Sequence, residues 1–155
     1  MDSIFDAVRS GDIAKVTSFL NNDPDLIRIQ DQRGSNILLL ATYYGFLEMT
    51  KAILAYNPDV DAKDASGNTA LMGVCFKGYV DIARALLEAG AEVNLKNYNE
   101  STPLIFAATF GQREIVKLLL EYGADPSVKD NRGYTAAMHA QNQGLDFSEL
   151  FKVTK

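Results

Sequence analysis

The chemical types along this chain of 155 residues repeat every 33 positions, the interval from Gly45 to Gly78. Four glycines share one column of the repeat and three lysines share another: Gly45, Gly78, Gly111 and Gly144; Lys63, Lys96 and Lys129. A third column holds Asp31, Asp64, Asn97 and Asp130. A fixed period of this size indicates an array of similar structural units, and it constrains the fold more than any single motif does.

Each unit contains two short helical patterns separated by a glycine. In the unit 64–96, apolar residues recur at helical spacing between positions 71 and 75 and again between 80 and 87, on either side of Gly78. Helices this short are marginal in water, so their stability must come from stacking on neighbouring units. We therefore predict an all-α solenoid of stacked helix-turn-helix units joined by β-hairpin-like turns.

Polar residues and glycines predict where these helices begin and end. N-cap candidates precede the first helix of four units, with the asparagine as the weakest start: Thr69, Thr102, Thr135 and Asn36. Ser3 and Asp6 form a capping box at the beginning of the chain. The second helices are expected to stop at residues that tolerate a left-handed conformation, the last two of which precede proline: Gly90, Gly123, Asn57 and Asp23.

The repeat divides the chain into five units, of which the first and last are atypical: about 1–30, 31–63, 64–96, 97–129 and 130–155. The segments 102–108 and 115–125 resemble ankyrin repeats, whose period is about 33 residues and whose signature is T-P-L-H-x-A. The resemblance extends over essentially the whole chain. It implies a single ankyrin-repeat domain with a capping unit at each end.

Two departures from the ankyrin pattern predict local differences. The signature histidine is replaced by an apolar residue in every full unit, so we expect apolar packing in place of a Thr–His hydrogen bond: Leu39, Met72, Ile105 and Met138. The first unit also carries one extra residue between Leu20 and Asp31 relative to the next unit.

A third departure concerns one turn. Glu100 stands where the other turns have glycine, at Gly34, Gly67 and Gly133. Either Glu100 is strained in the left-handed conformation, or this turn takes another shape in which Asn97 or Asn99 supplies the unusual dihedral.

The sequence shows no catalytic or metal-binding constellation. Its one histidine, His139, and its one cysteine, Cys75, belong to different units, so no Cys/His dyad and no zinc template is indicated. We expect Cys75 to be a packed thiol in a column of small residues and His139 to be a surface or half-buried residue of the last unit. We predict a non-enzymatic protein without cofactor or metal; an enzyme or ligand-binding protein with an unrecognised pocket is the alternative.

Composition restricts the partner classes further. Fifteen basic and twenty acidic residues give a net charge of −5, whereas nucleic-acid binding favours a basic footprint. No apolar run has the length of a membrane-spanning helix. A single cysteine fits a reducing compartment. We therefore expect a soluble, cytoplasmic, monomeric protein that binds neither nucleic acid nor membrane.

The ankyrin resemblance implies a concave face, lined by the turn tips and first helices, as the usual partner site. Aromatic and cationic side chains fall on this face, and tyrosine and arginine dominate many binding hot spots. The predicted partner-binding residues are Arg33, Tyr43, Tyr44, Phe76, Lys77, Tyr98, Phe106, Phe110, Arg132 and Tyr134. The alternative is that several of these rings pack against neighbouring turns. We expect Tyr44 and Phe110, whose column also holds Lys77 and Gln143, to be solvent-exposed.

These observations favour a protein–protein interaction module that binds an unidentified partner protein through its concave face. The degenerate signature and compact size also resemble small bacterial immunity or effector-like ankyrin proteins, which would inhibit or redirect a specific target. A self-associating structural protein is a further alternative.

Overall fold

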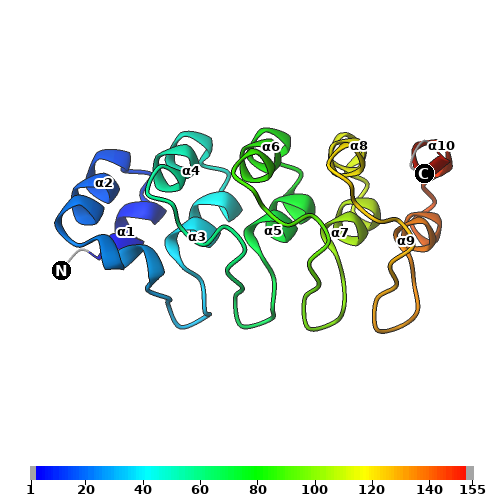
Figure 1. Cartoon of the computed structure of the whole chain (residues 1–155), viewed down its shortest axis with the longest axis horizontal. Coiled ribbons are helices and arrows are strands. Elements are labelled where there is room, and N and C mark those ends of the chain that lie inside the picture. Colours follow the sequence, from blue (N-terminus) through cyan, green and yellow to red (C-terminus); the bar gives the residue numbers. More distant parts are fainter. Residues whose placement is uncertain (1–2, 153–155) are drawn as a thin grey trace.

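The computed structural model describes residues 3–152, which form ten α-helices and one 3-10 helix in a single row of helix pairs (Figure 1). The first helices of the pairs are α1 (Ile4–Arg9), α3 (Ile37–Tyr43), α5 (Ala70–Lys77), α7 (Pro103–Thr109) and α9 (Ala136–Asn142). The second helices are α2 (Ile13–Asn22), α4 (Leu47–Leu54), α6 (Val80–Glu88), α8 (Arg113–Glu121) and α10 (Ser148–Lys152). The described residues contain no strand, which confirms the predicted all-α solenoid.

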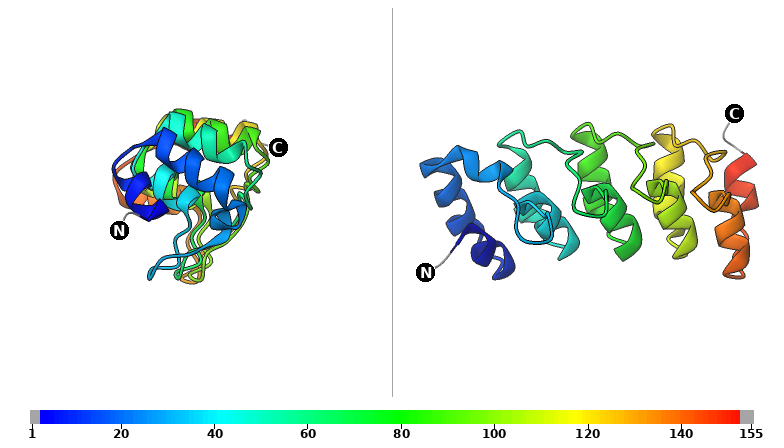
Figure 2. Two further views of the ribbon diagram at one scale, coloured as in Figure 1. Left: turned by 90° about the vertical axis from the view of Figure 1, so that its left-hand side faces the viewer. Right: turned by 90° about the horizontal axis from the view of Figure 1, so that it is seen from below.

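The two kinds of helix form two layers along the row (Figures 1 and 2). Within one layer α3 packs on α5, α5 on α7 and α7 on α9, while α4, α6 and α8 pack on one another in the second layer. A continuous apolar core lies between the layers; its largest fully buried side chains include Leu20, Ile37, Ile53, Leu71, Leu86, Leu104, Ile115 and Leu119. Because each pair buries its apolar faces against its neighbours, the array holds together only as a stack.

The first helices begin at the predicted N-caps. The side chains of Thr69, Thr102 and Thr135 each accept a hydrogen bond from the backbone N–H three residues later, at 3.2 to 3.3 Å. Asn36, the predicted weakest start, makes the shortest of these bonds, 2.8 Å from the Leu39 N–H. The capping box of α1 is also present. These caps fix where each first helix starts, and therefore which of its side chains face outward.

The second helices end as predicted in three units but not in the first. Gly90, Gly123 and Asn57 have φ angles of 96°, 91° and 55°, all in the left-handed region. Asp23, in contrast, has φ −146°, so its predicted left-handed stop is wrong. Its side chain instead accepts from the Asp25 N–H and opens the 3-10 helix η1 (Pro24–Arg28), in the segment where the first unit carries its extra residue.

Hairpin-like turns project from the layer of first helices to one side of the row (Figures 1 and 2). In the turn before α5, the Asp64 N–H donates to the Asn68 carbonyl at 2.9 Å, and the Asp64 carboxylate accepts from the N–H groups of Ser66 and Asn68. The same three bonds recur in the other turns, around Asp31, Asn97 and Asp130. Each aspartate or asparagine therefore sets the shape of its turn.

The turns are also bonded to each other. Backbone N–H groups of three successive turns donate to carbonyls of the preceding turn: Ala65 to Arg33 at 3.2 Å, Tyr98 to Ser66 at 3.3 Å and Asn131 to Asn99 at 3.0 Å. A row of bonds between successive turns fixes the spacing of their tips. The side chains at the tips are thus held at defined positions along the array.

Glu100 adopts the left-handed backbone conformation that glycine has in the other turns. Its φ is 62°, close to the 77° of Gly34, whereas neither Asn97 nor Asn99 has a positive φ. The first of the two predicted alternatives is therefore correct. For a residue with a side chain this conformation costs on the order of 1 kcal/mol.

The positions of the missing signature histidine divide into two kinds. Leu39, Met72 and Ile105 are buried, as the prediction of apolar packing requires. Met138 is 42% exposed, so the prediction is wrong for the last unit. The reason is that α9 is the last first helix among residues 3–152, so within this range only α7 packs against it in that layer.

Candidate functional site

The first helices and the turn tips together form one side of the molecule, which we call the concave face. In the end-on view of Figure 2 the turns extend away from the helices, so that this side lies along the first helices and the inner side of the turns. Two surface hollows lie on it, each lined by residues of first helices and of turns. The concave face is the candidate functional site.

Most of the predicted binding residues are exposed on this face. Tyr44 and Phe110 are 42% and 48% exposed, and both lie at the ends of first helices as expected. Five more predicted residues are exposed: Arg33, Tyr43, Phe76, Lys77 and Arg132. Phe106 and Tyr134 are half-buried.

Neighbouring units bring several of these side chains into contact. The ring of Phe76 meets the ring of Phe110 edge-on, with centroids 4.7 Å apart. The Lys77 ammonium lies 4.9 Å from the centre of the Tyr43 ring. These contacts join α3, α5 and α7 across the face, yet all four side chains stay exposed. Neighbouring side chains therefore pack on one another and also remain exposed to solvent.

Tyr98 has a partly structural role. It is the most exposed of the large apolar side chains, at 69%. One side of its ring nevertheless covers Gly67 of the preceding turn, where an added Cβ would lie 2.7 Å from the Tyr98 ring. The ring therefore packs on a neighbouring turn, as the alternative interpretation proposed, while its outer side faces solvent.

A hollow of about 290 Å³ opens on the face between α3 and α5. Its lining comes from both helices and their turns: Arg33, Ser35, Leu39, Leu40, Thr42, Tyr43, Tyr44, Asp64, Asn68, Thr69, Ala70 and Gly73. Gly73 lies in the repeat column of Leu40, Phe106 and His139, and is the one member without a side chain. Sequence reasoning missed this hollow, although the glycine in an otherwise filled column signals it.

A second hollow adjoins the first toward the amino terminus. It is lined by Arg9, Asp31, Gln32, Arg33, Leu40 and Tyr44, and three of these residues belong to both hollows. Arg9 forms ion pairs with Asp6 at 3.4 Å and with Asp31 at 3.9 Å. The two hollows therefore form one depression that crosses the first three units.

Three cations on the concave face have no carboxylate partner. Among residues 3–152, neither Arg33 nor Lys77 nor Arg132 forms an ion pair. Lys77 and Arg132 lie instead near aromatic rings, the Arg132 guanidinium 5.5 Å from the Tyr134 ring centre. A face that carries unpaired cations beside exposed rings attracts carboxylates.

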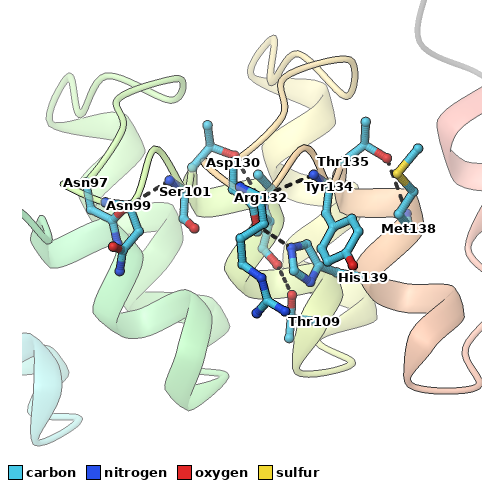
Figure 3. A network of polar contacts seen from close by, with 12 residues as sticks. Asn97, Asn99, Ser101, Thr109, Asp130, Arg132, Tyr134, Thr135, Met138 and His139 are labelled. Carbon is cyan, nitrogen blue, oxygen red and sulfur yellow. Dashed lines mark hydrogen bonds and ion pairs between the residues drawn. The ribbon is translucent and has the colours of Figure 1, made fainter.

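The last unit carries a polar cluster around Asp130 (Figure 3). One carboxylate oxygen accepts from the N–H groups of Arg132 and Tyr134, and the other lies 2.6 Å from Nε2 of His139. Burial alone would raise the pKa of Asp130, but the hydrogen bonds from Tyr134, His139 and Arg132 outweigh it and lower that pKa. His139 is half-buried, as predicted.

Cys75 is a packed residue. Its side chain is fully buried in α5, and this burial raises the pKa of the thiol. In the part of the chain that the structure describes, no group of three His, Cys, Asp or Glu side chains gathers as metal ligands. None of the helices formed by residues 3–152 combines the length and the apolar character that a membrane span needs.

Comparison with protein families agrees with this architecture. The family model described as ankyrin repeats in three copies matches residues 4–97, and the one described as ankyrin repeats in many copies matches residues 75–140. The chain belongs to the ankyrin-repeat family. A comparison with curated proteins gave no match. Ankyrin repeats are generally protein–protein interaction modules and are typically non-enzymatic, which directs attention to the concave face of this ankyrin-repeat protein.

Proposed function

We propose that this ankyrin-repeat protein is a non-enzymatic, monomeric module that binds another protein through its concave face. One observation carries the proposal: exposed aromatic rings, with cations that form no ion pair among residues 3–152, lie together along the first helices and turns of three successive units. The rings are Tyr43, Tyr44, Phe76 and Phe110, and the cations beside them are Arg33 and Lys77. Aromatic and arginine side chains supply most of the energy of many protein interfaces.

The rigidity of the face favours binding. The bonds between successive turns hold the tips in place, and the Phe76 and Phe110 rings are already in contact. Side chains that are ordered before binding lose little entropy when a partner arrives, so more of the contact energy appears as affinity. The sequence has a single cysteine, Cys75, which is buried, and this fits a reducing compartment such as the cytoplasm.

Affinity capture from a lysate of the native cell tests the proposal. The wild type is compared with a triple variant, Tyr44→Ala, Phe76→Ala and Phe110→Ala, whose fold is verified by circular dichroism. Tyr122→Ala is the matched control, since Tyr122 is equally exposed but ends a helix of the second layer. We expect a protein that the wild type and the control retain and that the triple variant loses.

Two other results would change the assignment. If the triple variant retains the same proteins as the wild type, the rings serve only to pack the array, and the proposed binding face is wrong. If the captured protein is the chain itself, and light scattering gives a mass that rises with concentration, the face mediates self-association. An inhibitor of the immunity or effector type would capture one target and abolish its activity at equal concentration.

A further inference from the structure

The depression beside Gly73 has features that specify what kind of partner segment fits it. We infer that the concave face takes an extended acidic peptide segment, one apolar side chain of which enters the hollow between α3 and α5. This inference rests on the proposed function and refines it. It is carried by the glycine, by the size of the hollow and by the charges at its edge.

Gly73 has no structural reason to be glycine. It lies inside α5, and its φ is not in the left-handed region. A Cβ added there would lie 3.7 Å from Cδ1 of Tyr43, an ordinary contact distance. Glycine inside a helix destabilises the fold, whereas alanine would fit at this position and favour the helix. The chain thus keeps a destabilising residue where the result is open space on the concave face.

The hollow is large enough to take one apolar side chain. Its volume of about 290 Å³ stands at the lower end of the roughly 300 to 1,000 Å³ that is usual for ligand pockets. Leu40, Tyr43 and Tyr44 supply its apolar wall. An apolar side chain that enters would cover these residues and lose its own contact with water, which is the usual way an anchor residue contributes to a protein interface.

Two cations and one carboxylate lie at the edge of the hollow, so this edge is net positive. Arg33 lines it, and Lys77 lies against the Tyr43 ring of its wall. Neither cation has an ion-pair partner among the residues that the structure describes. The Asp64 carboxylate also lines the hollow, but it already accepts from the N–H groups of Ser66 and Asn68.

The adjoining hollow extends the same charge pattern. Arg9 and Arg33 line it together with Asp31, whose carboxylate accepts two N–H groups of its own turn and faces Arg9. The second helices carry acidic and basic side chains together, for example Glu48 with Lys51, Asp81 with Arg84 and Glu114 with Lys117. A segment with carboxylates on both sides of one apolar residue therefore complements the cations that line this face.

A displayed library of random twelve-residue peptides provides the probe. The library is selected on the full-length wild type, and the strongest binders are synthesised with fluorescein and measured by anisotropy. Gly73→Leu fills the hollow, and Gly73→Ala is its matched control because it adds one methyl group. The charge test is the double variant Arg33→Glu, Lys77→Glu, with Lys117→Glu on α8 as its control. Circular dichroism and thermal unfolding verify that each variant folds.

The inference predicts that the selected peptides are rich in Asp and Glu around an apolar residue. Gly73→Leu should weaken their binding about 10- to 100-fold, which corresponds to the burial of one large apolar side chain. Gly73→Ala should change the dissociation constant less than about threefold. The double charge reversal should weaken binding at least about tenfold at low salt, and the difference from the wild type should shrink as salt is added.

Several results would overturn the inference, and they separate it from the proposed function. If Gly73→Leu binds the peptides as the wild type does, or if the peptides show no acidic excess, the hollow and its charges do not select the partner. The proposed function survives this result when the Tyr44→Ala, Phe76→Ala, Phe110→Ala variant still loses the peptides. If that variant also binds them normally, both proposals are wrong. If the selection yields no binder, the inference that the face takes a linear acidic segment is wrong. Affinity capture from lysate is then the remaining test of the proposed function.

Discussion

His139 and Asp130 form a side-chain pair that joins the last turn to the first helix after it. Nε2 of His139 lies 2.6 Å from the carboxylate of Asp130, and the Tyr134 ring stands edge-on to the imidazole, with centroids 5.4 Å apart (Figure 3). The corresponding residues Asp31, Asp64 and Asn97 shape their turns without a histidine. The unit that contains α9 therefore has an additional bond between its turn and its helix.

Removal of the imidazole should destabilise the protein. We expect His139→Ala to lower the free energy of unfolding by about 1 to 2 kcal/mol at pH 7, because it leaves one oxygen of a buried carboxylate without its partner. Urea unfolding followed by circular dichroism measures this. Asn142→Ala on the exposed side of the same helix is the control. Equal stability of the two variants would show that the pair contributes nothing measurable.

The Asp130 carboxylate should make stability depend on acid pH. Its folded-state pKa lies below the ordinary value of 3.8, so its ionised form stabilises the fold above that value. The contribution should be lost as the pH falls below 3.8 and through the lowered pKa of the folded state. Asp130→Asn keeps an oxygen for the two turn bonds, as Asn97 does, but carries no charge.

Urea unfolding between pH 2 and pH 7 tests this titration. The wild type should be more stable than Asp130→Asn at pH 7, and the difference should shrink toward pH 2. Carboxylates away from this pair titrate in both proteins alike, so the comparison reports on Asp130 together with His139, which contacts it. A difference that is constant over the whole range would mean that the amide, and not the charge, changes stability.

Relief of the strained turn should stabilise the protein. Glu100 has φ 62°, which glycine adopts without strain. Its ion pair with Lys96, at 4.0 Å, is largely exposed and contributes little. We expect Glu100→Gly to raise the free energy of unfolding by roughly 0.5 to 1 kcal/mol. Glu100→Ala, which keeps the strain and removes the charge, separates the two effects and should leave stability nearly unchanged.

Much of the fold could be predicted because its determinants are local and repeat. Thr69 caps a helix and Gly90 ends one through interactions within a few residues, and the period transfers each assignment to the next unit. The predicted left-handed stop at Asp23 is wrong because the first unit departs from the repeat at this point. There one extra residue allows a 3-10 helix that the other units lack, and only the local geometry shows which conformation results.

The candidate site could be predicted only in part. The exposure of Tyr44 and Phe110 follows from their place at the helix ends. The hollow beside Gly73 depends on how Tyr43 packs from the neighbouring helix, and the bond between His139 and Asp130 depends on how a turn folds back on a helix. Such relations join residues that no short motif connects, so the sequence pattern does not specify them.

The turn glycines should differ in their tolerance of alanine according to what covers them. Gly34 and Gly133 have similar φ angles, 77° and 84°. A Cβ at Gly133 would meet nothing within 4 Å, whereas a Cβ at Gly34 would lie 2.8 Å from the backbone nitrogen of Ala65 in the next turn. That nitrogen donates to the Arg33 carbonyl, so the clash also strains a bond between turns.

We therefore expect Gly133→Ala to cost only the strain of the left-handed conformation, about 1 kcal/mol. Gly34→Ala should cost about 1 to 3 kcal/mol more, because the next turn must move and its hydrogen bond to Arg33 weakens. Urea unfolding of the two variants measures the difference. Amide hydrogen exchange at Ala65 should be faster in Gly34→Ala and unchanged in Gly133→Ala. Equal costs with unchanged exchange would mean that the turns do not support one another, and that the rigidity proposed for the concave face has another origin.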